Sequence, residues 1–303
     1  MASSLFHNLL PQVQAGSFKA LARCISLVEN QVAGYELFMQ QLPSSRVPII
    51  GITGPPGAGK STLVDGLVNE WVSKGKKVGI ICVDPSSPFN LGALLGDRIR
   101  MSTWYNHPGV FIRSLATRGS VGGLNPGILE ITDVMRLAAF DYVLVETVGV
   151  GQSEIEIAGL SDVTVVVLVP EAGDEIQAMK AGLMEIANVF VVNKADRPNA
   201  DEFIRNLRLV LSAGTSQAAP SIPILKTTAL QKEGLSSLVQ IIEEQLSKTL
   251  SSDKKYWLLA ERAYHLIQKE RMSGVSKLLM KEKIISQLEN GTFNMYRLVQ
   301  EFG

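Results

Sequence analysis

The sequence predicts an α/β fold, with a doubly wound, mostly parallel sheet over residues 47–250 and helical segments at both ends of the chain. First, short β-branched runs alternate with stretches that are mostly long enough for crossover helices. Second, most of these runs are nearly continuously apolar, as is typical of strands that are buried on both faces. Third, residues 1–46 show helical periodicity, and residues 254–301 contain no β-like run.

The N-terminal segment, residues 1–46, is predicted to be a helical extension of the sheet domain. It contains two helical stretches, and the second, Tyr35–Leu42, ends before Pro43. The apolar residues of the first stretch recur at helical spacing, and they are Phe18, Leu21, Ala22, Ile25 and Val28.

Seven apolar runs are the predicted strands. One intervening helix has a clear start signal, with Asn125 as its cap and Pro126 in its first position, and is expected to continue over Ile128–Phe140. The predicted strands are Val47–Ile52, Val78–Val83, Val110–Leu115, Tyr142–Val145, Val163–Val169, Val189–Val192 and Ile222–Lys226.

The C-terminal segment, residues 251–303, is predicted to be a helical arm. Two helices fit, Tyr256–Arg271 and Val275–Leu288, and a third starts near Phe293. One apolar stripe on the first helix is consistent with packing on the main domain and equally with a dimer interface. The stripe consists of Leu259, Ala263, Leu266 and Ile267.

Composition narrows the function classes. Of 303 residues, 29 are Lys or Arg and 29 are Asp or Glu, so the net charge is zero and nucleic acid is not an expected partner. No apolar run reaches the roughly 18 residues of a membrane helix. The N-terminus lacks the features of a signal peptide, and we expect a cytoplasmic protein. Cys24 and Cys82 have no metal-ligand spacing, and we expect both to be reduced core residues.

A glycine-rich segment follows the first predicted strand and precedes a helical stretch, Thr62–Trp71. Its two glycines, lysine and serine match the phosphate-loop pattern, in which backbone N–H groups surround phosphate oxygens. The alternative is a glycine-rich turn with a chance lysine. Lys60 is expected to reach the β- and γ-phosphates, and Ser61 to bind Mg²⁺. The predicted phosphate-binding residues are Gly54, Pro55, Pro56, Gly57, Ala58, Gly59, Lys60, Ser61 and Thr62.

A second motif, Asn193-Lys194-Ala195-Asp196, follows the strand Val189–Val192. Asp196 would accept hydrogen bonds from guanine N1–H and the 2-amino group, which adenine cannot supply. Lys194 would cover the purine face, and Asn193 would brace the loop; the alternative is a solvated turn. A further base loop is expected at Thr227, Thr228 and Ala229. Together with the phosphate loop, this motif predicts a P-loop GTPase domain that binds GTP and GDP.

Three carboxylates are candidates for the Mg²⁺ side of this site. Glu146 ends a predicted strand in Glu146-Thr147-Val148-Gly149, where the N–H of Gly149 would contact the γ-phosphate and so sense its presence. Asp84 ends another strand, and Asp97 lies in the segment that follows. For each of the three, a structural carboxylate, helix cap or ion pair is the alternative. Lys60, Asp97 and Glu146 are the predicted catalytic residues.

No glutamine is placed to position the attacking water, apart from Gln152, for which a surface position is the alternative. Slow hydrolysis without a partner is therefore expected. The stretch Pro85–Gly96, rich in Ser, Pro and Gly, suits a switch loop.

These residues together resemble one family, the MeaB/ArgK (MMAA) GTPases, which are chaperones of adenosylcobalamin-dependent acyl-CoA mutases. Glu in place of the usual Asp of the third motif is a mark of that branch. The motifs that carry the resemblance are GPPGAGKST from Gly54, VDPSSPF from Val83, GALLGDRIRM from Gly92, ETVGVGQSE from Glu146 and NKAD from Asn193.

The resemblance implies that GTP binding and hydrolysis gate cofactor loading into a methylmalonyl-CoA mutase-like enzyme and protect it from inactivation. It also implies that Asp84, Asp97 and Glu146 lie beside Mg²⁺, and that the C-terminal arm forms a homodimer. A third switch is implied over Glu171–Lys180, whereas the residues alone suggest a capped helix start. Its expected coupling residues are Asp174, Glu175, Gln177 and Lys180.

Two other functions remain open on the sequence. A kinase of a transport protein or small molecule needs an acceptor site with a base beside the γ-phosphate, and His107 alone lies near the motifs. A metal-delivery GTPase normally has a tract rich in His or Cys, and this chain has three His and two Cys.

Overall fold

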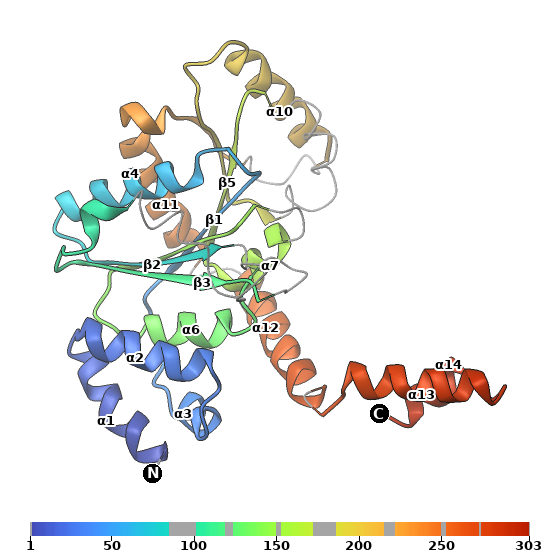
Figure 1. Ribbon diagram of the computed structural model, residues 1–303. Helices are drawn as coiled ribbons and strands as arrows, with labels where there is room; N and C mark the ends of the chain where they lie inside the picture. Colours follow the sequence, from blue (N-terminus) through green and yellow to red (C-terminus); the bar gives the residue numbers. More distant parts are fainter. Residues whose placement is uncertain are drawn as a thin grey trace. The chain divides into compact units, whose positions relative to one another are not determined.

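The computed structural model describes residues 2–84, 101–118, 124–149, 153–171, 186–214, 222–249, 253–272 and 274–302. The chain divides into two compact units, Met1–Lys255 and Tyr256–Gly303 (Figure 1). Within the described ranges, no helix combines the length and apolar character that crossing a bilayer requires.

The larger unit contains a seven-stranded sheet in the order β3-β2-β4-β1-β5-β6-β7, in which every pairing is parallel. All seven predicted strands are present, and the predicted α/β class is confirmed. The last strand begins at Ile224 rather than Ile222. The strands are β1 Ile49–Thr53, β2 Val78–Asp84, β3 Val110–Ala116, β4 Tyr142–Glu146, β5 Val163–Leu168, β6 Val189–Val192 and β7 Ile224–Lys226.

The register brings the carboxyl ends of the central strands to one edge. Ile52 of β1 lies beside Glu146 of β4, and Glu146 lies beside Cys82 of β2. Asp84, the last residue of β2, is therefore two positions farther along than Glu146. In open parallel sheets this edge is where ligands bind.

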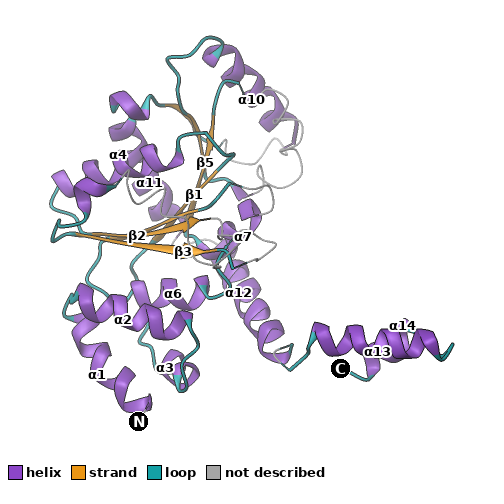
Figure 2. Ribbon diagram, viewed as in Figure 1, coloured by secondary structure: helices purple, strands orange, loops and turns teal. Residues whose placement is uncertain are grey.

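Helices cover both faces of the sheet (Figure 2). On one face, α4 (Lys60–Ser73) and α11 (Leu235–Thr249) pack on β1, β2 and β5, and Trp71 at the centre is fully buried. On the other face lie the N-terminal helices, α6 (Ile128–Met135) and α7 (Ser153–Leu160). A third cluster joins α10 (Ala200–Gly214) to β5 and β6. The fold is thus doubly wound, as predicted.

The N-terminal helices are α1 (Ala2–Gln14), α2 (Phe18–Glu29) and α3 (Tyr35–Gln40), and they belong to the same compact unit as the sheet. Ser17 caps α2, since its hydroxyl accepts the N–H of Ala20 at 3.3 Å. The predicted periodicity of α2 is seen in its burial: Leu21, Ile25 and Val28 face the core, while Phe18 and Ala22 are half-buried.

Helix α6 differs from its prediction. It runs over Ile128–Met135, so it begins after Gly127 and ends well before Phe140. Asn125 does not cap the helix; its Oδ1 accepts the Gly127 N–H at 2.8 Å, and its Nδ2 donates to the carbonyl of Ala116 at 2.7 Å. The predicted cap and first position were wrong because Asn125 binds the end of β3, a contact that local sequence does not reveal.

The smaller unit is helical. It contains most of α12 (Asp253–Arg271), together with α13 (Lys277–Glu289) and α14 (Met295–Gln300). Ser276 and Asn294 cap the last two helices through their side chains. Of the predicted apolar stripe, Leu259, Leu266 and Ile267 are exposed by 49%, 37% and 47%.

Helix α7 (Ser153–Leu160) packs directly on the backbone of β1 at Gly51. A Cβ on Gly51 would lie 2.6 Å from Ile157 Cγ1 and 2.9 Å from Ser161 Oγ. Gly51→Ala should therefore lower the free energy of unfolding by about 1–3 kcal/mol, the usual cost of overpacking a core. Denaturant titration measures this difference.

The matched control is Gly159→Ala on α7 itself, where an added methyl meets no atom within 4 Å. Because alanine has a higher helix propensity than glycine, the free energy of unfolding of this variant should rise by about 0.5–1 kcal/mol. Equal stability of the two variants would contradict the proposed close contact between α7 and β1.

Candidate nucleotide-binding site

The loop between β1 and α4 adopts a conformation that requires glycine. Gly54, Gly57 and Gly59 have φ values of +139°, +76° and +86°, a region that side chains disfavour. A Cβ on Gly54 would collide with the carbonyl oxygen of Val167 on β5. The loop is therefore held against the neighbouring strand, and its backbone curves around the amino end of α4.

Lys60 is the first residue of α4, and its side chain is 7% exposed. Its ammonium group donates to the carbonyls of Gly54 at 2.8 Å and Pro55 at 3.0 Å. The cation thus lies inside the curve of the loop. The amino terminus of α4 adds the N–H groups and partial positive charge of a helix start, so this concave backbone can bind an anion such as phosphate.

Two oxygen-bearing side chains meet at the carboxyl edge of the sheet. The hydroxyl of Ser61 donates to Glu146 Oε1 at 2.7 Å, and both residues are buried. Beside them, the hydroxyls of Thr53 and Thr147 lie 2.9 Å apart. Asp84 is 1% exposed at the end of β2. These hard oxygen donors are of the kind that Mg²⁺ takes in small numbers, with water and phosphate completing its shell.

In the part of the chain that the structure describes, no group of three or more His, Cys, Asp and Glu side chains forms a metal site. Asp97, the third predicted carboxylate, lies outside the described residues, as do Gln152 and the switch residues Asp174, Glu175, Gln177 and Lys180.

Gly149, three residues beyond Glu146, touches the phosphate loop. Its φ is +86°, and a Cβ would collide with the carbonyl oxygen of Gly54 and approach the ammonium group of Lys60. The segment after β4 therefore runs directly over the loop, where only a residue without a side chain fits.

Asn193 ties the phosphate loop to the other two loops of the site. Its side chain is buried, and its Nδ2 donates to the carbonyl of Ala58 at 2.9 Å. Its Oδ1 accepts the hydroxyl of Thr227 and the N–H of Ala229, both at 3.1 Å. One amide thus satisfies groups from two segments that are far apart in sequence from each other and from Asn193.

The neighbours of Asn193 extend this connection. Lys194 has a φ of +56°, and its ammonium group donates to the carbonyl of Gly57 at 2.7 Å. The N–H of Ala195 donates to Thr227 at 3.1 Å, and Thr228 pairs with Glu233. Asp196 is exposed. The sequence motifs are therefore brought together around one site.

One ion pair at this edge was missed by the sequence reasoning. Arg197, directly after Asp196, binds Glu171, which follows β5, and this hydrogen bond holds the pKa of the Glu171 carboxyl below its usual value. Only the position of Glu171 after a strand, and of Arg197 after the base motif, could have suggested the pair.

The pattern that defines the family described as "Methylmalonyl Co-A mutase-associated GTPase MeaB" matches residues 21–283. The chain belongs to the MeaB family of GTPases. This result confirms the predicted resemblance. Among its relatives, a GTPase of Pyrococcus horikoshii is 41% identical over 290 residues, covering 93% of this chain and 90% of that protein. GTPase ArgK of Escherichia coli is 31% identical over 271 residues, covering 86% and 81%.

A fused isobutyryl-CoA mutase of Geobacillus kaustophilus is 37% identical to this MeaB-family chain over 211 residues, which are 66% of this chain and 19% of that protein. Among solved structures, a LAO/AO transport system kinase has a TM-score of 0.64 at 21% identity and covers 99% of this chain and 96% of its own. HypB of Helicobacter pylori, in complex with nickel, has a TM-score of 0.52 at 17% identity, covering 76% and 98%. These structural likenesses show the fold alone.

The role of Asn193 as a structural connector can be tested without nucleotide. Asn193→Ala leaves the Ala58 carbonyl, the Thr227 hydroxyl and the Ala229 N–H without their amide partner in a buried place. We expect the free energy of unfolding to fall by about 1–3 kcal/mol. Asn206→Ala, at an exposed position of α10, should stay within about 0.5 kcal/mol of the parent. Equal effects of the two changes in denaturant titration would argue against that role.

Proposed function

We propose that this MeaB-family GTPase binds and hydrolyses GTP with Mg²⁺, and thereby controls an adenosylcobalamin-dependent acyl-CoA mutase. The observation that carries the nucleotide assignment is the amide of Asn193, which links the carbonyl of Ala58 in the phosphate loop to Thr227 and Ala229. Because these loops are tied together, a single nucleotide can occupy the phosphate loop and the base loops at once.

The position of the nucleotide's phosphates is inferred from the contacts of Lys60. The ammonium group of Lys60 donates to two loop carbonyls, and phosphate oxygens carry more negative charge than these carbonyls do. We propose that Lys60 exchanges these carbonyls for the β- and γ-phosphates. The loop N–H groups and the start of α4 would hold the remaining oxygens. The residues assigned to the phosphates are Gly54, Pro55, Pro56, Gly57, Ala58, Gly59, Lys60, Ser61, Thr62 and Gly149.

The position of Mg²⁺ in the site is inferred from Ser61 and Glu146. Their hydrogen bond places a hydroxyl and a carboxylate oxygen 2.7 Å apart at the mouth of the phosphate loop, next to the end of β2 at Asp84. We assign Ser61, Asp84, Asp97 and Glu146 to Mg²⁺, either directly or through water. When bound, the cation neutralises phosphate charge. Lys60, Asp97 and Glu146 are the residues we propose to act in hydrolysis.

The base end of the nucleotide is assigned to Asn193, Lys194, Asp196, Thr227, Thr228 and Ala229. Asp196→Asn should shift the preference from GTP towards xanthosine triphosphate, because the amide can donate to the 2-oxo group that replaces the 2-amino group. Each charge-assisted bond contributes about 1.5–3 kcal/mol, so the affinity for GTP should fall by about tenfold or more. Titration with both labelled nucleotides measures this, with Asp201→Asn on α10 as the matched control. Unchanged GTP affinity would exclude Asp196 as the guanine partner.

The mutase assignment rests on the family and on one relative. The family description names association with methylmalonyl-CoA mutase. In Geobacillus kaustophilus, a region that is 37% identical to this chain is part of a fused isobutyryl-CoA mutase. The bond from Arg197 to Glu171 also joins the residue after the base motif to the first residue of the predicted third switch. We propose that Asp174, Glu175, Gln177 and Lys180 in that switch transmit the nucleotide state to the mutase.

A homodimer through the C-terminal arm is the second part of the proposal. In the smaller unit, Tyr256, Trp257 and Tyr264 are exposed by 73%, 69% and 58% within the single chain. Tyr and Trp side chains are enriched at protein interfaces. A second copy of the arm would remove these aromatic side chains from water.

The mutase proposal is tested with purified proteins. The GTP-bound chain should bind methylmalonyl-CoA mutase or isobutyryl-CoA mutase about 5–150-fold more tightly than the GDP-bound chain, the range of typical coupling between two sites. Biolayer interferometry with each nucleotide gives the ratio, and GTP turnover should rise when the mutase is present. The Asp196→Asn variant should respond to xanthosine triphosphate instead. Absence of binding to either mutase, together with phosphate transfer to a small substrate or protein, would favour a kinase.

A further inference from the structure

Strand β3 forms one edge of the sheet and has β2 as its neighbour in the described chain. The carbonyl of Gly109 accepts the N–H of Val78, and the N–H of Thr117 donates to Asp84. Since alternate residues of a strand point their backbone groups to opposite sides, Ile112 and Ser114 direct theirs away from β2.

Both ends of this outer edge are closed by the chain itself. The N–H of Val110 donates to the carbonyl of His107 at 3.1 Å, and the carbonyl of Ala116 accepts from Asn125 at 2.7 Å. Between these closed ends, the outward N–H and C=O groups of Ile112 and Ser114 have no hydrogen-bond partner among the residues that the structure describes. An open apolar edge of this kind invites pairing with another strand.

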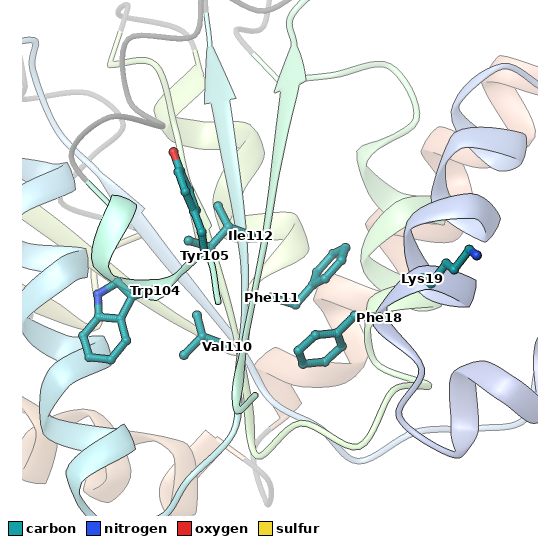
Figure 3. Close-up of a pocket in the computed structure, with 7 residues that line it drawn as sticks. All are labelled: Phe18, Lys19, Trp104, Tyr105, Val110, Phe111 and Ile112. Carbon is teal, nitrogen blue, oxygen red and sulfur yellow. The ribbon is translucent and has the colours of Figure 1, made fainter. Parts of the chain in front are cut away.

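A hollow of about 490 Å³ lies along this edge, and aromatic side chains stand on both sides of β3 (Figure 3). On one side, Phe18 of α2 packs beside Phe111, with ring centroids 5.5 Å apart. On the other side stand Trp104 and Tyr105, and Tyr105 is 47% exposed. We call these two aromatic groups the walls of the hollow: Phe18 and Phe111 form one, and Trp104 and Tyr105 form the other. Successive side chains of an added strand would point alternately to the two walls.

Contacts within the chain fix the side chains that form the two walls. The indole N–H of Trp104 donates to Asp65 on α4 at 2.7 Å. Phe18 also stacks on Phe140 at 5.8 Å. A groove that does not have to reorganise loses little entropy on binding.

The charge beside the hollow indicates which kind of segment can bind to the β3 edge. Among the described residues that line the hollow, Lys19 is the charged one, and it is exposed on α2. Arg23, one helical turn farther along, is also exposed. An antiparallel pairing of two β3 strands would keep both α2 helices on one face and bring like charges together, which disfavours a second copy of this chain.

We propose that the outer edge of β3 binds an extended segment of a partner protein, in which apolar residues alternate with acidic ones. The segment would pair with the backbone of Ile112 and Ser114. Its apolar residues would lie on the side of Trp104 and Tyr105, and its acidic residues on the side of α2, with a carboxylate facing Lys19. The hollow lies at the amino half of β3, along Val110 to Ile112, and Ser114 is separated from Glu146 of β4 by the intervening strand β2. The inference does not depend on the proposed nucleotide site or on a mutase.

The test uses the full chain and an acetylated, amidated octapeptide that alternates Glu with Val and Phe, together with a counterpart carrying Lys in place of Glu. The parent protein should bind the acidic peptide at least about tenfold more tightly than the basic one. In hydrogen exchange, the peptide should slow the Ile112 and Ser114 amides, while the Phe111 and Arg113 amides, which face β2, stay unchanged.

Two variants with matched controls complete the test. Ile112→Pro removes the outward N–H without touching the ladder to β2, and should abolish binding, whereas Ile112→Val should retain it. Lys19→Glu should remove the preference for the acidic peptide, whereas Arg208→Glu on α10 should keep it. GTP turnover should be unchanged in all four.

Three results would overturn the proposal: no binding of either peptide to the parent, binding to Ile112→Pro at parental affinity, or an equal loss in Lys19→Glu and Arg208→Glu. If Ile112→Pro instead lowers the oligomeric state of the protein in sedimentation without affecting peptide binding, the edge is occupied by a second copy. Should Ile112→Pro fail to fold, Lys19→Glu and the hydrogen-exchange pattern still decide.

Discussion

The buried amide of Asn193 is the contact on which the proposed nucleotide site depends. It pairs with the phosphate loop through Ala58 and with the last loop of the sheet through Thr227 and Ala229. An amide offers both a donor and an acceptor, so one side chain can satisfy a carbonyl on one loop and an N–H on another. The loops are irregular, and a buried polar group without a partner is costly. This residue therefore holds the phosphate and base loops together, and Lys194 adds a second bond to the phosphate loop at Gly57.

The parallel sheet supplies the second constraint. Because β1, β2 and β4 are neighbours that end at the same edge, Ser61 forms a hydrogen bond with Glu146, and Asp84 ends the strand beside Glu146. Glycines at Gly54 and Gly149 let two loops cross at this edge without side chains between them. The same topology leaves β3 at the margin of the sheet, where its backbone is accessible to another chain.

Much of the fold could be predicted because its signals are local. The strand at Val189–Val192 has the bounds that its apolar run indicated, and the helical spacing of Leu21, Ile25 and Val28 matches their burial. The prediction was wrong where a distant partner decided the local structure. Asn125 carries a good helix-cap signal, yet its side chain binds the carbonyl of Ala116 on β3, and the helix begins later. Arg197 and Glu171 likewise gave no local signal of their pairing.

The sequence by itself determined that a glycine-rich loop joins a strand to a helix, that a guanine motif follows a later strand, and that the chain belongs among MeaB-family GTPases. These features depend on residues that are close together in the chain. Only the tertiary structure decided which strands are neighbours, and with them the bond from Ser61 to Glu146, the bracing by Asn193 and the open edge of β3. The physical reason is that hydrogen bonding between strands fixes their order only when distant segments pack together, and composition and periodicity carry no record of that order.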